Sequence, residues 1–293
     1  MELVAKVCGI NTSDSIYNLT VKDKLDNTYN LKISNIDGIT QGYTYLFNLE
    51  SASKDGRDYY LIKSFKDIAL LDSEEADKYL RDFYPASPIS LKESIKQIYD
   101  YLNRIDNKII KDIAVDILDE AKDKFFIYPA AAKLHHNYVG GLAYHTLGML
   151  KLSEGFLLNY PYLNKDYLFA GIVLHDIGKI IELSGIINTE YTIEGQLLGH
   201  LVIGAMKVKE VAAKLGYDKT KEALLLEHIL ISHHGVPQFG SAKKPMTPEA
   251  LVLWYIDTID SKFRVLGEVL EKTETDTFSE PVGVIDKTKI YKV

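Results

Sequence analysis

The chain has 293 residues, of which 46% are hydrophobic and 26% are charged, and its formal net charge is −7. This composition is typical of a soluble globular protein, and the length suggests one large domain or two domains. The single cysteine, Cys8, excludes an intrachain disulfide. No apolar run approaches the roughly 18 residues of a membrane-spanning helix, and the start of the chain lacks the features of a signal peptide. We therefore expect a cytoplasmic protein without a membrane partner.

The first 65 residues contain short stretches of β-forming residues separated by turn signals. Residues 28–33 and 43–49 alternate apolar and polar side chains, and Asp37-Gly38 and Gln41-Gly42 mark turns between them. Five short strands at this spacing favour a small closed barrel such as the OB fold.

Four tyrosines lie in these expected strands: Tyr43, Tyr45, Tyr59 and Tyr60. They could form a face on which single-stranded bases stack, and we assign Tyr43 and Tyr45 to substrate binding. The simpler interpretation is that they are ordinary strand residues, half-buried against the barrel, because tyrosine is abundant throughout the chain. Both interpretations stay open at this point.

From Ser90 onward the pattern of apolar residues is helical. Ser90 and Glu93 form a capping-box pattern, and Thr247 followed by Pro248 starts the last helix. Helices are predicted at about 107–126, 139–158, 165–182, 192–215, 219–233 and 247–272. The fold class is therefore α+β and multidomain. A small OB-like β-barrel (1–70) is followed by a helical connector (71–89), an all-α helical bundle (90–272) and a C-terminal tail (273–293).

All eight histidines of the chain lie between His135 and His234. Five of them, with two aspartates, form an ordered series on segments expected to be helical: His145, His175, Asp176, His200, His233, His234 and Asp257. Successive groups are 23 to 33 residues apart. This is the length of a helix with its loop, so these side chains can converge inside a bundle.

Imidazole and carboxylate groups are the ligands that borderline divalent metals prefer. Seven such groups exceed the needs of one tetrahedral ion and suit two metals that share a carboxylate. The central pair, His175 and Asp176, ends an apolar run typical of a buried helix, where unpartnered charge is strongly disfavoured. For this pair alone, a capped helix end with a stray histidine is the simpler interpretation. The whole ordered series favours metal binding.

The motifs around these residues resemble the HD-domain metal phosphohydrolases. They are PAAAKLHH (129–136), GGLAYHT (140–146), EGQLLGH (194–200), SHHG (232–235) and YIDTIDSK (255–262). Together they are similar to the YhaM-type 3′→5′ exoribonucleases, which carry an OB fold ahead of the HD domain. The resemblance is good over residues 88–272 and loose over the first 70 residues.

The resemblance implies two divalent metals with Asp176 as the bridging ligand. The first would be held by His145, His175, Asp176 and Asp257, and the second by Asp176, His200, His233 and His234. Mn²⁺ is the expected metal, and the ligand set also permits Fe²⁺ or Co²⁺.

Two details of this ligand set can be examined in the sequence. Asp260 lies one turn after Asp257 and could exchange roles with it, although the family's final aspartate is the first of such a pair. His233 and His234 can both reach one metal only if their helix ends there, which Gly235 favours.

Four further residues could serve the reaction. Lys179 lies one turn after the central pair and could act with Asp176 in catalysis by neutralising a phosphate oxygen; its alternative is a solvated helix end. His136 belongs to a resemblance motif and could contact the substrate phosphate or base. Lys243 and Lys244 could contact RNA, or could simply belong to a solvated loop.

The resemblance implies a metal-dependent 3′→5′ exoribonuclease that releases nucleoside 5′-monophosphates from single-stranded RNA. Single-stranded DNA and a homo-oligomeric assembly stay open. A first alternative is an HD phosphohydrolase of a small nucleotide, such as a nucleoside triphosphate, cyclic nucleotide or alarmone. A second alternative is a non-catalytic nucleic-acid-binding module. The net charge of −7 is a weak argument against an RNA substrate.

Overall fold

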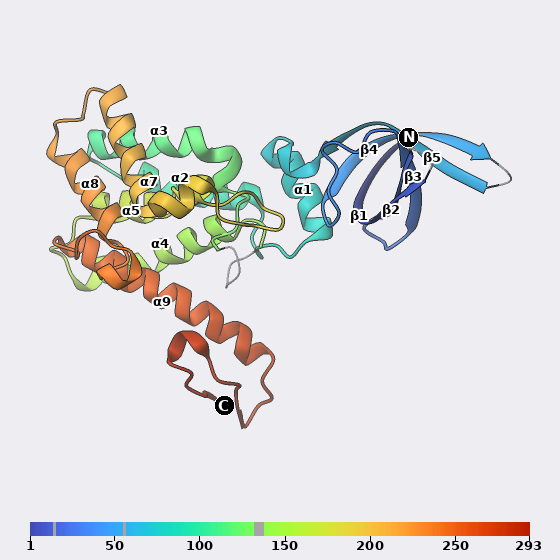
Figure 1. Ribbon diagram of the computed structural model, residues 1–293. Helices are drawn as coiled ribbons and strands as arrows, with labels where there is room; N and C mark the ends of the chain where they lie inside the picture. Colours follow the sequence, from blue (N-terminus) through green and yellow to red (C-terminus); the bar gives the residue numbers. More distant parts are fainter. Residues whose placement is uncertain (14–15, 55–56, 132–137) are drawn as a thin grey trace. The chain divides into compact units, whose positions relative to one another are not determined.

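The computed structural model describes residues 1–13, 16–54, 57–131 and 138–293 (Figure 1). The chain forms two compact units. One comprises Met1–Ala86 with Gly185–Asn188, and the other comprises Ser87–Ser184 with Thr189–Val293.

The first unit is built on a closed five-stranded barrel. Its strands are β1 (Glu2–Ser13), β2 (Ile16–Lys22), β3 (Thr28–Ile33), β4 (Thr44–Lys54) and β5 (Arg57–Asp67). The strand order is β1-β2-β3-β5-β4, and β1 pairs with both β2 and β4, which closes the sheet. The β3–β5 pairing is parallel and the other pairings are antiparallel. The predicted OB-like barrel is therefore confirmed.

The barrel core corrects the prediction for Tyr45. Alternate residues of β4 point inward, so that Tyr45, Phe47 and Leu49 belong to the core. The Tyr45 side chain is 1% exposed, and its hydroxyl accepts a hydrogen bond from the Thr40 amide at 2.8 Å. Its ring is therefore closed to a nucleobase, and its assignment to substrate binding is wrong. Tyr43 is half-buried and packs against the edge of the same core.

The barrel unit also contains the first helices. A 3₁₀ turn (Ile68–Leu70) leads into α1 (Ser73–Phe83), whose N-cap is Asp72. After α1, the hydroxyl of Tyr84 lies 2.8 Å from that of Thr44 in β4. This contact ties the segment after α1 to the barrel wall.

The second unit is helical. Its helices are α2 (Leu91–Asn103), α3 (Lys108–Phe125), α4 (Gly141–Asn159), α5 (Lys165–Leu174), α6 (Lys179–Glu182), α7 (Ile193–Lys214), α8 (Lys221–Ser232) and α9 (Pro248–Glu271). A short two-stranded sheet, β6 (Thr277–Phe278) and β7 (Tyr291–Lys292), follows them. Among the described residues, no helix is both long and apolar enough to cross a membrane.

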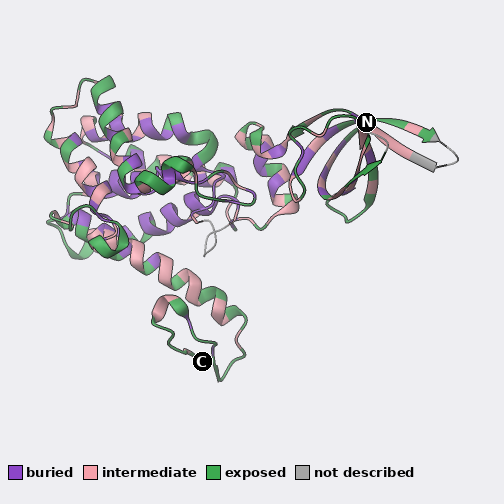
Figure 2. Cartoon of the chain, viewed as in Figure 1, coloured by how far each residue is buried: buried purple, intermediate pink, exposed green. Residues whose placement is uncertain are grey.

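Helix α5 lies at the centre of this unit. All its residues from Leu168 to Leu174 are buried, and it contacts α2, α3, α4, α8 and α9 (Figure 2). The single helix predicted at 165–182 is wrong, because the chain turns between Leu174 and Lys179 and only then forms α6. This turn carries His175 and Asp176 at the end of the most buried helix.

Helix α7 is kinked at Gly199. This residue has φ +73° and ψ 154°, a conformation that is essentially restricted to glycine. The kink frees the backbone N–H of His200, which donates to the Glu182 carboxylate at 3.1 Å. His200 therefore starts the second segment of α7 rather than lying inside a continuous helix.

We predict that Gly199→Ala lowers the free energy of unfolding by about 1–3 kcal/mol, because alanine is strained in this conformation. Steric crowding adds little to this loss of stability, since the nearest atom to an added Cβ would be a Glu182 oxygen at 3.9 Å. Chemical denaturation followed by circular dichroism measures the change. The control is Gly267→Ala in α9, where nothing lies within 4 Å and where alanine should stabilise the helix by about 0.5–1 kcal/mol. Equal effects of the two substitutions would contradict the kink.

Candidate metal centre

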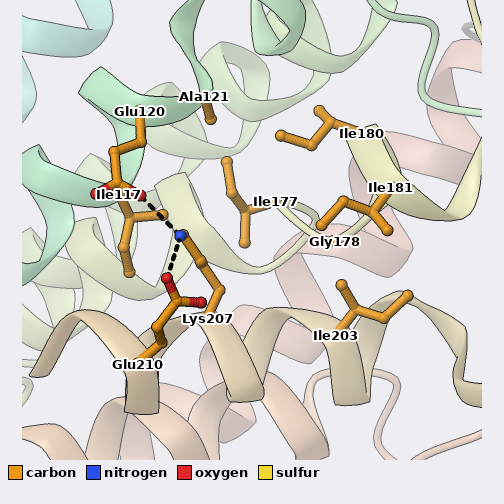
Figure 3. A pocket seen from close by; sticks show the side chains of 10 residues that line it. All are labelled: Ile117, Glu120, Ala121, Ile177, Gly178, Ile180, Ile181, Ile203, Lys207 and Glu210. Atoms are coloured by element: carbon orange, nitrogen blue, oxygen red, sulfur yellow. Dashed lines mark hydrogen bonds and ion pairs between the residues drawn. The ribbon is translucent and has the colours of Figure 1, made fainter. Parts of the chain in front are cut away.

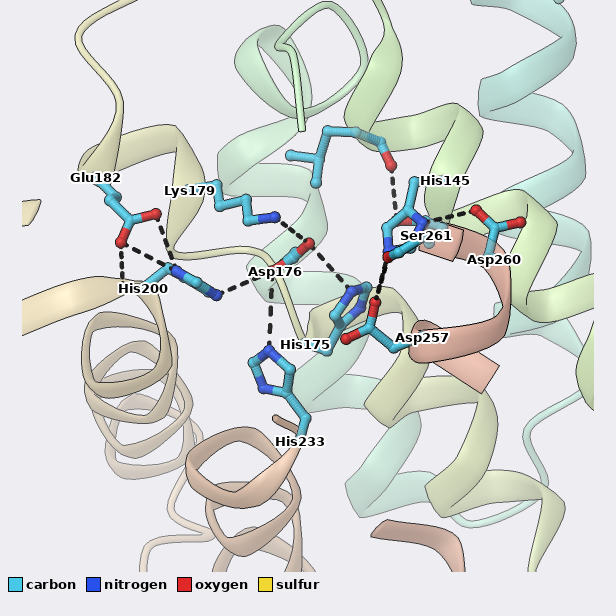
Figure 4. A network of polar contacts seen from close by, with 12 residues as sticks. His145, His175, Asp176, Lys179, Glu182, His200, His233, Asp257, Asp260 and Ser261 are labelled. Carbon is cyan, nitrogen blue, oxygen red and sulfur yellow. Dashed lines mark hydrogen bonds and ion pairs between the residues drawn. The ribbon is translucent and has the colours of Figure 1, made fainter. Parts of the chain in front are cut away.

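The seven predicted ligands come from five helices and converge in the helical unit. Figure 4 labels all of them except His234. His145 lies on α4, His175 and Asp176 follow α5, His200 lies on α7, His233 and His234 follow α8, and Asp257 lies on α9. Five of them are at most 9% exposed: His145, His175, Asp176, His200 and His233. The structure therefore brings together residues that are up to 112 positions apart, from His145 to Asp257.

Two groups of metal-binding side chains can be distinguished. His145, His175 and Asp176 form one, and His200, His233 and His234 form the other; within each group, ligand atoms lie within 4.8 Å of one another. These groups match the two sites that the family resemblance implies, except that the first lacks Asp257 and the second lacks the shared Asp176.

Asp176 lies between the two groups. Its Oδ2 is 3.2 Å from His175 Nε2, and its Oδ1 is 3.2 Å from His200 Nε2 and 3.9 Å from His233 Nε2. Each carboxylate oxygen thus faces a different set of histidines. This is the arrangement that a bridging carboxylate requires.

In all five imidazole rings of the predicted ligands, Nδ1 faces a hydrogen-bond acceptor. Three face backbone carbonyls: His175 that of Ile172 at 2.6 Å, His233 that of Leu230 at 2.7 Å, and His234 that of Phe239 at 2.6 Å. Two face carboxylates: His145 that of Asp260 at 2.8 Å, and His200 that of Glu182 at 3.0 Å. An acceptor at Nδ1 fixes the tautomer whose Nε2 lone pair is free, and it sets the direction of the ring.

Because the helix ends at His233, the adjacent side chains of His233 and His234 can both face one metal site. α8 ends at Ser232, His233 is its C-cap, and Gly235 follows with φ +80°. The predicted end of the helix at this point is confirmed. Side chains of consecutive residues would diverge in a continuous helix, whereas here both rings belong to one group.

The structure gives Asp257 and Asp260 different positions around His145. Asp257 Oδ1 lies 3.3 Å from Nε2 of this ring, while Asp260 Oδ2 lies 2.8 Å from Nδ1. Asp257 is therefore on the side of the candidate metal site, and Asp260 is behind the ring. This geometry supports Asp257 as the ligand and Asp260 as its support.

Several buried polar atoms of the site lack a hydrogen-bond partner among the described residues. They are Nε2 of His175, His200 and His233, and Oδ1 of Asp176. A buried polar atom without a partner costs about 1–3 kcal/mol, so four of them in one cluster would be a large penalty. All four point to the same region and are metal-ligand atoms. The residues present therefore fit the divalent metal binding that an HD domain implies.

Charges within the site are strongly coupled. Burial disfavours the charged form of His145, but its contacts with Asp257 and Asp260 prevail and raise its pKa to about 9. Burial also raises the pKa of Asp257, but His145 outweighs this effect and the net shift is downward. Burial beside other imidazoles lowers the pKa of His233 well below its usual value. A cation bound at His145 Nε2 must therefore displace a proton, whereas His233 is already neutral.

Two charged residues lie next to Asp176 and His200. The Lys179 ammonium group is 2.7 Å from Asp176 Oδ2, and its side chain is 17% exposed. The Glu182 carboxylate accepts a hydrogen bond from the backbone N–H of His200 and contacts Nδ1 of its ring. Glu182 was not among the residues predicted for the site. Its only signal was an acid one turn after Lys179, and the kink at Gly199 that brings His200 to it is a tertiary feature.

The remaining predicted residues are not members of these groups or lie outside the described structure. Lys243 and Lys244 are exposed in the loop between α8 and α9 and form no ion pair with any described residue. His136 lies in 132–137, outside the described residues. Tyr43 belongs to the barrel unit.

A separate cavity of about 230 Å³ lies between α3, α6 and α7 (Figure 3). Half of its lining residues are isoleucines. At one side, the Lys207 ammonium group forms ion pairs with Glu120 at 2.7 Å and with Glu210 at 3.0 Å. None of the seven predicted ligands lines it. This cavity is therefore distinct from the histidine–aspartate cluster.

Residues 142–262 match the HD domain family. Over 211 residues the chain is 40% identical to the 3′-5′ exoribonuclease YhaM of Geobacillus sp. (strain WCH70). The match covers 72% of the present chain and 65% of the relative, slightly less than two thirds of its length. No solved structure matches the chain at a significant level. Residues 142–262 are thus similar to HD domains, and the chain resembles the YhaM-type 3′→5′ exoribonucleases, as its sequence motifs predict.

Proposed function

We propose that the protein is a metal-dependent 3′→5′ exoribonuclease that hydrolyses single-stranded RNA to nucleoside 5′-monophosphates. The observation that carries this proposal is the buried cluster in which Asp176 joins two groups of histidines with unpartnered Nε2 atoms. The similarity to a protein named as a 3′-5′ exoribonuclease supports the reaction class. RNA is the proposed substrate on the same grounds.

The positions of the side chains support the ligand assignment that we propose. One ion would be held by His145, His175, Asp176 and Asp257, and the other by Asp176, His200, His233 and His234. Mn²⁺ is the proposed metal, with Fe²⁺ or Co²⁺ as chemically reasonable substitutes. When bound, two divalent ions supply a hydroxide nucleophile and stabilise the charge that develops on the phosphate.

The surrounding residues have three tasks in this proposal. The Nδ1 partners hold the direction of the rings, so that their Nε2 atoms face the centre. Lys179 places a positive charge beside Asp176, where it can neutralise the negative charge on a non-bridging phosphate oxygen. Lys243 and Lys244 are free to contact the RNA backbone because no described acid neutralises them.

The barrel has a residue pair suited to holding a single strand. On the outer side of β3 and β5, the Lys32 ammonium group lies 3.9 Å from the centre of the Tyr59 ring. Both side chains point away from the core, since their neighbours Leu31 and Tyr60 pack against it. An aromatic face beside a cation can stack a base and attract its phosphate. We propose Tyr59, rather than Tyr45, as the stacking residue.

A time course on 5′-end-labelled single-stranded RNA with Mn²⁺ tests the reaction. We expect a ladder that shortens from the 3′ end and disappears with chelator. Asp176→Ala should reduce activity to background and remove both metals, since it deletes the shared ligand. The control is Asp106→Asn, a carboxylate that is 82% exposed and paired only at the surface with Lys165. Full turnover by Asp176→Ala would refute the assignment, and intact RNA with two bound metals would favour a small nucleotide substrate.

Tyr59→Ala tests the role of the barrel. Loss of one stacked base should cost about 1–3 kcal/mol, which is about a 5- to 150-fold increase in KM for long RNA with kcat unchanged. Tyr162→Ala is the control, because Tyr162 is 70% exposed and lies in the helical unit. An unchanged KM for Tyr59→Ala would exclude this tyrosine from RNA binding.

A further inference from the structure

A line of contacts runs outward from the metal-binding side chain of His145. Behind this ring, Asp260 Oδ2 lies 2.8 Å from Nδ1. The other oxygen of Asp260 lies 3.4 Å from Nε of Arg264, one turn further along α9. Arg264 in turn donates to the Tyr144 hydroxyl at 2.8 Å, and its guanidinium lies 4.3 Å from the centre of that ring. Asp260 therefore has one oxygen for the histidine and one for the arginine.

A glycine on α4 provides the space for this line. A Cβ added at Gly148 would lie 2.4 Å from Asp260 Oδ1 and 3.1 Å from Arg264 Nη2. Glycine inside a helix is less stable than alanine by about 0.5–1 kcal/mol, so this position requires another explanation. The close approach of the Asp260 carboxylate supplies it.

Two of the histidines have a carboxylate at Nδ1, one in each of the two metal-binding groups. Asp260 supports His145 in one group and Glu182 supports His200 in the other, while the remaining three rings rest on backbone carbonyls. A carboxylate partner makes a metal-bound imidazole more basic and holds its direction. Each group thus has one histidine with an anionic support, and loss of either support should affect one group more than the other.

We propose that Arg264, acting through Asp260, is a positioning residue for the metal ligand His145, and that Gly148 reserves the space this contact needs. This inference rests on the metal-binding part of the proposed function and is independent of the RNA substrate. Arg264 fixes the orientation of the Asp260 carboxylate by engaging Oδ1, which leaves Oδ2 directed at the His145 ring. The planar guanidinium, stacked on Tyr144, gives this contact a direction that a lysine would not.

The outer end of the line is accessible to small solutes. Arg264 lines an open cleft of about 560 Å³ between α4 and α9, together with Lys151, Leu152 and Phe263. Its side chain is 34% exposed. A guanidinium ion from solution can therefore reach the position of the Arg264 head group when the side chain is removed.

The experiment is a calorimetric titration of Mn²⁺ into the full chain after removal of metal by chelator. Asp260→Asn and Arg264→Ala should each weaken one of the two binding steps, by about 10- to 100-fold for Asp260→Asn. Glu182→Gln should weaken the other step. Millimolar guanidinium should restore affinity to Arg264→Ala and leave the wild type unchanged. The matched control is Lys151→Ala, because Lys151 lines the same cleft but does not belong to the line of contacts described above; this variant should bind Mn²⁺ as the wild type does.

Gly148→Ala separates positioning from helix stability. If glycine had no spatial role, alanine would stabilise α4 and leave Mn²⁺ affinity intact; if it reserves space for Asp260, affinity for the same step falls as in Asp260→Asn. Circular dichroism identifies variants that are not folded, and Arg264→Ala, with its partly exposed side chain, then decides the question. Wild-type affinity in Arg264→Ala, or equal losses at both steps, would overturn the inference. A wild type that binds Mn²⁺ with this dependence but leaves RNA intact would refute the substrate and retain the positioning role.

Discussion

The shared carboxylate of Asp176 is the constraint on which the arrangement of the helical unit depends. Its two oxygens face different histidine groups, so α4 and α9 must approach from one side and α7 and α8 from the other. The residue itself is 3% exposed and follows the most buried helix. Burial disfavours its charge, but His175 and Lys179 outweigh this effect and hold the pKa of Asp176 well below its usual value. The convergence of the surrounding helices on the site therefore depends on keeping the Asp176 carboxylate ionised at its centre.

Helix ends are the means by which the chain meets that constraint. α5 stops at Leu174, α8 stops at Ser232, and α7 is interrupted at Gly199. Each interruption lies next to one of the proposed metal ligands, His175, His233 or His200. A regular helix presents one side chain per turn to a given point, whereas a helix end can present two consecutive residues or release a backbone N–H to a carboxylate. The helix ends and the kink therefore position the proposed metal ligands, whereas the regular helical segments form the packed core.

This division explains how much could be predicted from the sequence. The barrel, the helical bundle and the end of α8 at His233 were predictable, because alternation, helical periodicity and a glycine are local signals. Glu182 was not, because its contact with His200 depends on the kink at Gly199. The order of Asp257 and Asp260 around His145 also stayed open, since one helical turn separates two residues that lie on opposite sides of one ring. Tyr45 was misassigned because alternation shows that a strand has two faces but not which face is the core.

The charge of the site bears on how an acidic chain could act on a polyanion. With the histidines neutral, as metal ligation requires, four carboxylates surround the centre: Asp176, Asp257, Asp260 and Glu182. Lys179 and Arg264 are the cations paired with them, which leaves a formal excess of two negative charges. Two divalent ions would reverse this excess to two positive charges. Attraction of a phosphodiester would then be a property of the loaded centre and not of the chain's net charge of −7. The proposed RNA hydrolysis therefore does not require a basic surface, and the negative net charge of the chain is only a weak argument against an RNA substrate.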